Sequence, residues 1–191
     1  MIIAITGTPG TGKTGVCNAS GLACMDLNSV IAEQGFYTGV DAERGSLIAD
    51  LAKLKEYVRS KEKEQKRLVI EGHLAHFLNP DVAIVLRANP LVLAGRLRQK
   101  GFPPQKIQEN VEAETLDIIL AEAVERCEVV YEVDTSGKSV EEVASLLRAI
   151  IDAELEEEKE RERRSLRERY KPGSVDWTSF FEMICRTATY H

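Results

Sequence analysis

Residues 7–14 read Gly-Thr-Pro-Gly-Thr-Gly-Lys-Thr, and this stretch decides the fold of the chain. It matches the pattern G-x-x-x-x-G-K-[ST], in which backbone N–H groups of a glycine-rich turn surround phosphate oxygens. The preceding residues 2–5 are apolar and mostly β-branched, as expected of a buried parallel strand. Residues 13–20 can begin a helix whose free N–H groups and dipole face the turn. This order of strand, turn and helix predicts a nucleoside triphosphate site.

The P-loop, as such a turn is called, predicts roles for its side chains. Lys13 would reach the β- and γ-phosphates, and the Thr14 hydroxyl would ligate Mg²⁺. The alternative is a glycine turn that binds nothing, but every fixed position of the pattern matches in the right structural context.

The composition indicates one ordinary α/β domain, alone or with an appendage. The chain has 191 residues, of which 43% are hydrophobic and 29% charged. Its net charge of −6 argues against a general nucleic-acid coating but not against a local basic patch. The basic clusters at 59–67 and 161–171 alternate with glutamates, which favours solvated helix faces.

Sequence patterns also predict the compartment. No apolar run approaches the ~20 residues of a membrane span, and the first residues read as a core strand rather than a signal peptide. We therefore expect a cytoplasmic protein with no membrane partner. The cysteines are widely spaced, without a C-x-x-C pair, and read as ordinary thiols.

Apolar runs at 22–25, 67–71, 82–86 and 129–133 predict further strands of a parallel sheet. Residues 26–64 read as a helical insertion between two of these strands. It would contain a small helix capped by Asn28 or Ser29, a turn-rich stretch at 35–45, and a periodic helix starting at Ser46. In P-loop kinases, the phosphate-accepting substrate binds to such an insertion.

Glu71 ends one apolar strand, which is the Walker B arrangement: its carboxylate would hold Mg²⁺ through water or position the nucleophile. His73 follows at the carboxyl edge of the strand, where open parallel sheets place ligands. The sequence leaves two readings of His73 open, a functional group or a hydrogen-bonded loop histidine. We expect His76 to be structural.

Basic residues gather around a predicted hinge at Gly101. A helix beginning at 89–90 is broken at 100–104, and residues 106–126 read as a second long helix. Cations on a mobile lid could stabilise the charge of a phosphoryl group in transfer and exclude water. The alternative is a pair of basic helices facing solvent. The candidate lid cations are Arg87, Arg96, Arg98, Lys100 and Lys106.

The loop at 134–138 follows the last strand and is expected either to flank the adenine ring or to be a simple turn before a helix capped by Ser139. This helix would span residues 140–155. Residues 152–169 alternate acids and bases and predict a solvent-exposed helix. The aromatic tail after 172, which includes Trp177, either folds back on the domain or binds a partner or a second copy.

These motifs together resemble the adenylate kinase isoenzyme 6 family, P-loop proteins of archaea and eukaryotes also described as ribosome-assembly ATPases. The resemblance covers about residues 1–151 and is of the archaeal type. Beyond the P-loop it depends on Val-Ile-Glu-Gly-His at 69–73, Val-Leu-Arg at 85–87, Arg-Leu-Arg-Gln-Lys-Gly-Phe at 96–102, and Lys-Ile-Gln-Glu-Asn-Val-Glu-Ala-Glu at 106–114. The last two runs are more specific than the P-loop alone.

The resemblance implies a five-stranded parallel sheet flanked by helices, as in nucleoside monophosphate kinases. It implies an insertion near residues 26–49 that binds the nucleoside monophosphate, and a short lid near 99–109. Residues 152–191 would form an added charged helix and aromatic tail. The implied activity is ATP:AMP phosphotransfer with Mg²⁺, accompanied by ATP hydrolysis. The implied role is maturation of small-subunit ribosomal RNA through a small-subunit ribosomal protein.

By position, the resemblance makes Lys100 the lid cation and places Lys138 on the adenine loop. The loop residues that it implies for ATP binding are Gly10, Thr11, Gly12, Lys13, Thr14 and Gly15. This chain has Gly15 where many members carry a hydroxyl residue, Lys100 where they carry arginine, and Glu71 where several carry aspartate. Lysine lacks the bidentate phosphate geometry of arginine, so Arg98 is a second candidate for the lid cation. The family's histidine is present as His73.

Three functions remain open at this point. In a kinase, Lys13, Arg96, Arg98 and Lys100 would neutralise charge while Thr14 and Glu71 manage Mg²⁺. In an ATPase that remodels a ribosomal protein–RNA partner, Glu71 or His73 would orient the attacking water. The third is a kinase for another small metabolite. The insertion is small for a dedicated nucleoside monophosphate kinase, which favours a dual or assembly role.

Overall fold

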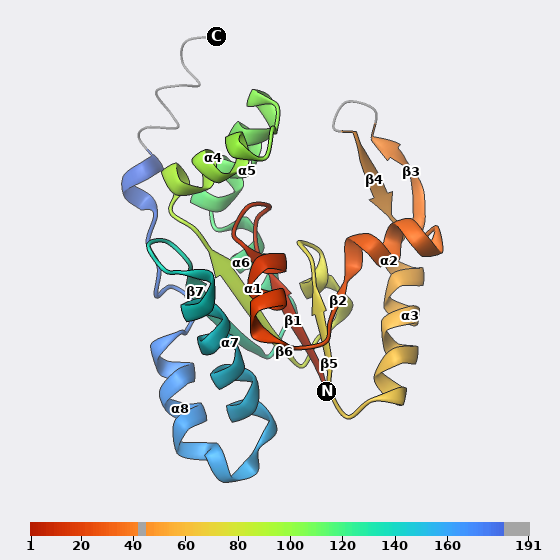
Figure 1. The fold of residues 1–191 in the computed structure, drawn as a ribbon, viewed down its shortest axis with the longest axis vertical. Helices are drawn as coiled ribbons and strands as arrows, with labels where there is room; N and C mark the ends of the chain where they lie inside the picture. The colour runs from red at the N-terminus through yellow and green to blue at the C-terminus, as the bar shows by residue number, and fades with distance from the viewer. Residues whose placement is uncertain (42–44, 182–191) are drawn as a thin grey trace.

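The predicted strands form one parallel sheet of five strands in the order β2-β5-β1-β6-β7 (Figure 1). The computed structural model describes residues 1–41 and 45–181. The strand that leads into the P-loop, β1, lies at the centre, and Ile5 pairs with Glu71 on one side and Ile84 on the other. The five strands are β1 (Ile2–Thr6), β2 (Cys24–Asp26), β5 (Leu68–Glu71), β6 (Val82–Arg87) and β7 (Val129–Asp134).

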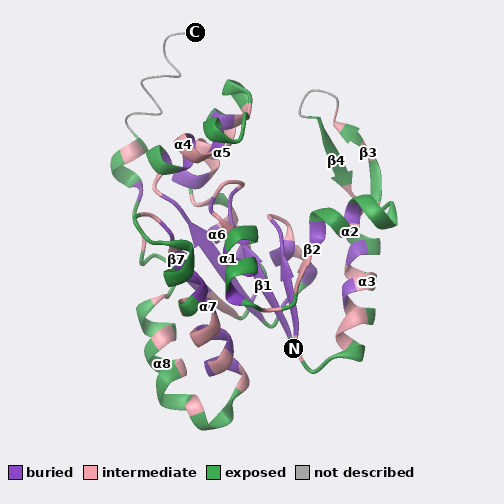
Figure 2. Cartoon of the chain, viewed as in Figure 1, coloured by how far each residue is buried: buried purple, intermediate pink, exposed green. Residues whose placement is uncertain are grey.

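Helices cover both faces of this sheet, so its strands are apolar on both sides. Ile3 and Ile5 pack beneath α1 (Lys13–Ser20) and α7 (Val140–Leu155). Side chains on the opposite face of the sheet, Ile2 among them, pack against the helices of the insertion and against α6. Figure 2 shows the central strands β1, β5 and β6 as the most continuously buried part of the molecule. The helices of the second face are α2 (Leu27–Gln34), α3 (Leu51–Glu64) and α6 (Ile118–Arg126), with a 3₁₀ turn at Ala75–Leu78.

The insertion contains an antiparallel hairpin, so the predicted helix start at Ser46 is wrong. Strands β3 (Tyr37–Asp41) and β4 (Ser46–Ala49) pair with each other and stand apart from the main sheet (Figure 1). The helix begins only at Leu51 because the Asp50 side chain caps it by accepting from Lys53 N.

Two further expectations for the insertion need correction. Asp26 caps α2 by accepting from Asn28 N, so neither Asn28 nor Ser29 is the cap. The turn-rich prediction for 35–45 is wrong over β3, and residues 42–44 lie outside the described residues.

The predicted helix over 106–126 is two helices, α5 (Pro104–Thr115) and α6, which follow α4 (Pro90–Gln99). The break falls at Asp117, whose backbone adopts a left-handed conformation with φ 55°. That conformation lets the Asp117 carboxylate pair with the guanidinium of Arg87. A long-range ion pair thus interrupts a helix that the local pattern would continue.

The C-terminal part folds back on the domain as far as it is described. Ser139 caps α7, as one of the two expectations for this loop had it, and does so in a capping box with Glu142. Helix α8 (Glu160–Arg169) lies beside α7 (Figure 1). Its Leu166 and the following Tyr170 both pack against the core. The 3₁₀ turns Glu157–Lys159 and Thr178–Phe180 flank this region, and Trp177 between them is 9% exposed. The rest of the predicted tail, residues 182–191, lies outside the described residues. Among the helices of residues 1–41 and 45–181, none has the length and apolarity that crossing a bilayer demands.

Candidate active site

A pocket of about 560 Å³ lies at the carboxyl ends of the central strands. It joins the P-loop to the insertion on one side and to the α4–α5 region on the other. Its walls are built by Thr8, Pro9, Gly10, Gly12, Lys13, Thr14, Gly15, Asn28, Ser46, Glu71, His73, Lys100, Phe102, Lys106, Glu109, Asn110, Ala113 and Ile119. Most of the predicted site residues are therefore brought together in one cavity.

The P-loop backbone turns through three positions in the positive-φ region, which glycine adopts without steric cost. Gly7, Gly10 and Gly12 all have positive φ, at 136°, 96° and 103°. A Cβ on Gly7 would lie 2.2 Å from the carbonyl oxygen of Leu86, so only glycine fits there. Helix α1 begins directly afterwards, at Lys13, and its first N–H groups are left free to meet an anion.

Lys13 folds over the P-loop. Its Nζ donates to the carbonyl oxygens of Gly7 at 2.7 Å and Thr8 at 3.1 Å. Burial lowers the pKa of Lys13 to about 8, against an opposing contribution from Glu71. A triphosphate in the loop would offer this ammonium charged oxygens in place of the neutral carbonyls. Charged oxygens are the stronger acceptors.

Thr14 and Glu71 meet in the pocket from different elements. The Thr14 hydroxyl donates to Glu71 Oε1 at 2.8 Å, and burial raises the pKa of Glu71. Within the part of the chain that the structure describes, no group of three or more His, Cys, Asp or Glu could hold a metal ion. Mg²⁺ usually takes one or two protein oxygens and completes its shell with water and phosphate. The hydroxyl and carboxylate oxygens therefore fit Mg²⁺ bound with a nucleotide.

The two histidines after β5 differ in environment. His73 lines the pocket, and burial, followed by the charge of Lys13, lowers the pKa of His73 to about 4. Its ring is therefore neutral near pH 7 and can exchange a hydrogen bond but supplies no positive charge. His76 is fully buried between Thr6 Oγ1, 3.0 Å from its Nδ1, and Glu122 Oε2, 3.1 Å from its Nε2, in accord with the structural role expected of it.

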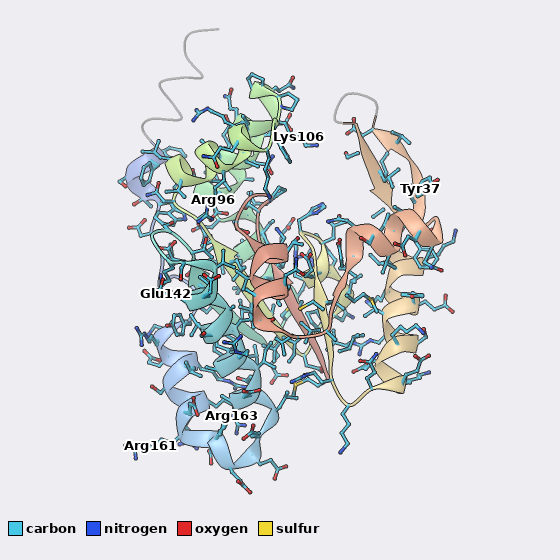
Figure 3. All side chains as sticks on the ribbon, in the orientation of Figure 1. Tyr37, Arg96, Lys106, Glu142, Arg161 and Arg163 are labelled. Atoms are coloured by element: carbon cyan, nitrogen blue, oxygen red, sulfur yellow. The ribbon has the colours of Figure 1, made fainter. Side chains whose placement is uncertain are left out.

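The predicted cations occupy distinct places. Lys100 and Lys106 line the pocket. Arg98 instead lines a separate apolar cavity of about 530 Å³ between α4 and α5. Arg96 lies above the P-loop (Figure 3), where its Nη1 donates to Gly10 O at 3.5 Å and Thr11 O at 3.4 Å. Lys138 Nζ donates to the carbonyl of Asp134 at 2.7 Å within its own loop.

The prediction that Arg87 joins the lid cations is wrong. Its side chain is enclosed and 2% exposed. It pairs with Glu114 at 2.7 Å, with Glu132 at 2.5 Å, and with Asp117. A guanidinium committed to three carboxylates is not available to a phosphate.

Two amides of the pocket were not anticipated as site residues. Asn28 comes from α2, where it was considered only as a helix cap. Asn110 lies on α5 with Lys106 and Ala113, which share one helix face at spacings of four and three residues. Helical periodicity applied to residues 106–114 would have identified that face. Asn28 reaches the pocket only because of how the insertion folds, and no pattern in the neighbouring sequence would have identified it as a pocket residue.

Comparisons with known proteins agree with this geometry. The family model described as an AAA domain (AAA_18) matches residues 3–117. A Methanosarcina acetivorans protein named "Putative adenylate kinase" is 43% identical over 187 residues, covering 93% of this chain and 97% of its own. A protein of the same name from Archaeoglobus fulgidus is 41% identical, covering 95% of this chain and 94% of its own. The solved shikimate kinase of Bacteroides thetaiotaomicron matches with a TM-score of 0.56 at 19% identity, covering 80% of this chain and 98% of that one, which shows a shared fold.

Proposed function

On the premise that the chain belongs to the AAA domain family matched over residues 3–117 and to the family of archaeal relatives that carry the name "Putative adenylate kinase", we propose that it transfers a phosphoryl group from ATP to AMP. We assign it to the isoenzyme 6 branch on the sequence resemblance given above. We further propose that it works in the cytoplasm.

One observation carries the proposal: a single pocket joins the P-loop to side chains of the insertion. Gly12 and Lys13 line one side of it, and Asn28 and Ser46 line another. A hydrolase needs room for water beside the γ-phosphate, whereas a kinase needs a second substrate within reach. A cavity of about 560 Å³ is within the range of small-molecule sites, roughly 300–1,000 Å³.

Each group then has a stated task. The P-loop N–H groups and Lys13 bind the β- and γ-phosphates, and Lys100 adds positive charge where negative charge develops. Mg²⁺, held by Thr14 and through water by Glu71, would neutralise phosphate charge. The acceptor approaches from the insertion side, so no covalent protein intermediate is needed. Residues 26–49 are on this account the acceptor-binding insertion and residues 99–109 the lid, with 152–191 an added C-terminal part.

A second candidate is an ATPase that acts on a small-subunit ribosomal protein during ribosomal RNA maturation. The neutral ring of His73 and the carboxylate of Glu71 lie in the same pocket as Thr14, where either could orient a water toward the γ-phosphate. Both activities use the same P-loop and differ in the acceptor of the phosphoryl group.

The test is a product assay with Mg·ATP, with and without AMP, that resolves ADP from free phosphate. The kinase produces ADP only when AMP is present and releases no phosphate. Phosphate release that does not depend on AMP would overturn the kinase assignment in favour of the ATPase. Lys13→Ala should abolish either activity; if it left both intact, the whole nucleotide site would be misassigned.

A further inference from the structure

The C-terminal arm, residues 170–177, is attached to the last strand of the sheet at one residue, Glu132, by its backbone and its carboxylate. Glu132 N on β7 donates to the carbonyl of Tyr170 at 2.7 Å. In return, the backbone N–H groups of Ser174 and Val175 donate to Glu132 Oε2, at 2.8 and 3.2 Å. The arm therefore depends on the position of a carboxylate side chain that is fully buried.

The other oxygen of Glu132 faces into the protein. Its Oε1 accepts from Arg87 Nη1 at 2.5 Å, and Arg87 Nε donates to Glu114 Oε1 at 2.7 Å. Glu114 belongs to α5 and is 2% exposed. Hydrogen bonds between charged groups in such an enclosed setting are strong and demand fixed geometry.

Glu114 completes the connection to the P-loop. The Thr8 hydroxyl donates to Glu114 Oε2 at 2.5 Å. The carbonyl of the same Thr8 accepts from Lys13 Nζ at 3.1 Å and from the Thr11 hydroxyl at 2.9 Å. A carboxylate of α5 thus holds the residue to which the P-loop lysine is bonded.

We propose that Glu132 and Glu114 are positioning residues that couple the C-terminal arm, through Arg87, to Thr8 and thereby hold the P-loop in its nucleotide-binding shape. The two oxygens of each carboxylate bond to different parts of the chain, so moving either carboxylate disturbs both parts. Glu132 accepts from the arm and from Arg87. Glu114 accepts from Arg87 and the adjacent Ala88 N–H with one oxygen and from Thr8 with the other. The inference rests on the proposed nucleotide site and adds a control on its affinity.

The test compares Glu132→Gln, Thr8→Val and the double variant. Glutamine preserves the volume of Glu132 but replaces one accepting oxygen by a donor, which breaks one of its two connections. Valine removes only the Thr8 hydroxyl. The dissociation constant for Mg·ATP is measured without AMP, and urea unfolding is measured in parallel. We expect each single variant to weaken ATP binding by about tenfold, a typical coupling between sites.

The double variant decides whether the contacts act as one unit. If they do, the double variant binds ATP no more weakly than the single variant with the lower affinity. A loss of affinity in the double variant equal to the product of the two single losses would overturn the coupling. So would single variants that are less stable but bind ATP as tightly as the wild type. If Glu132→Gln does not fold, Val175→Pro, which removes one N–H donor of the arm to Glu132 Oε2, takes its place in the same comparison with Thr8→Val.

Two matched variants serve as controls. Thr8→Ser retains the hydroxyl that Thr8→Val lacks and should bind Mg·ATP as tightly as the wild type. Arg167→Gln breaks the 2.6 Å ion pair with Glu154 that fastens α8 next to the arm but outside the Arg87 contacts. Arg167→Gln should reduce stability and leave ATP affinity unchanged. A loss of ATP affinity as large as that of Glu132→Gln would mean that any destabilisation of the C-terminal part weakens binding, and it would overturn the proposal. Wild-type protein that fails to bind ATP would instead refute the proposed function itself.

Discussion

The Thr14 hydroxyl donates to Glu71 Oε1 at 2.8 Å and so joins the first turn of the P-loop helix to the end of strand β5. The two residues are far apart in sequence and meet because β5 and β1 are neighbours in the sheet. Two oxygens of different chemistry, a hydroxyl and a carboxylate, are thereby placed side by side where the phosphates of ATP are proposed to bind.

Replacing Glu71 by Gln tests the proposed contact with Mg²⁺. The amide can still accept from Thr14 but lacks the charge that would hold a metal-bound water. We expect phosphotransfer to fall roughly 10- to 100-fold, as when outer-shell groups of metal sites are changed, with a higher Mg²⁺ requirement. Initial rates across a Mg²⁺ titration measure this. An unchanged Mg²⁺ dependence would separate Glu71 from the metal, and ATP binding without Mg²⁺ is the control.

Lys13 should make ATP binding sensitive to alkaline pH. Because burial lowers the pKa of Lys13 to about 8, the ammonium is present below that pH and is lost above it. Affinity for ATP should therefore be steady up to about pH 7.5 and then weaken by at most about tenfold per pH unit. Calorimetric titration at several pH values measures the effect. In Lys13→Arg, whose side chain stays charged, the alkaline loss should disappear; its persistence would assign the titration to another group.

The lid cation should be Lys100 rather than Arg98. Lys100 lines the P-loop pocket, whereas Arg98 lines the apolar cavity between α4 and α5. We expect Lys100→Ala to lower kcat by about 100-fold, the loss typical when a group that stabilises transition-state charge is removed. Arg98→Ala, its matched control two residues away, should change kcat little. Steady-state kinetics of both variants decide the point, and the reverse order of effects would transfer the role to Arg98.

Arg87 should be the most sensitive ionic residue for stability. Arg87→Met leaves the carboxylates of Glu114 and Glu132 buried without their cation, which typically costs about 3–5 kcal/mol. Urea unfolding measures the loss. The surface variant Arg126→Met should change stability by less than about 0.5 kcal/mol. A comparably small effect at Arg87 would show that the carboxylates relax by taking up protons or reaching solvent.

Local patterns predicted some elements well and others poorly, for identifiable reasons. Helix α7 has the predicted bounds because Ser139 and Glu142 form its cap within four residues of sequence. The hairpin β3–β4 was missed because the apolar residues 47 and 48 continue the helical period of α3, and only pairing with β3 makes them a strand. The break before α6 was missed because Asp117 is recruited by Arg87, on a different element.

The sequence by itself determined the P-loop, the five parallel strands and the residues at their carboxyl ends, since each of these depends on neighbours a few positions away. It therefore identified Lys13, Thr14 and Glu71 as candidates and indicated the class of ligand. Only the tertiary structure decided which cations face the pocket and which are consumed by ion pairs. Arg87 and Lys100 are both basic residues near a hinge, and the difference between them is burial among carboxylates from α5 and β7. Such partners are brought together by the packing of the whole chain, because their encounter stabilises the protein only after the sheet and the helices around it have formed.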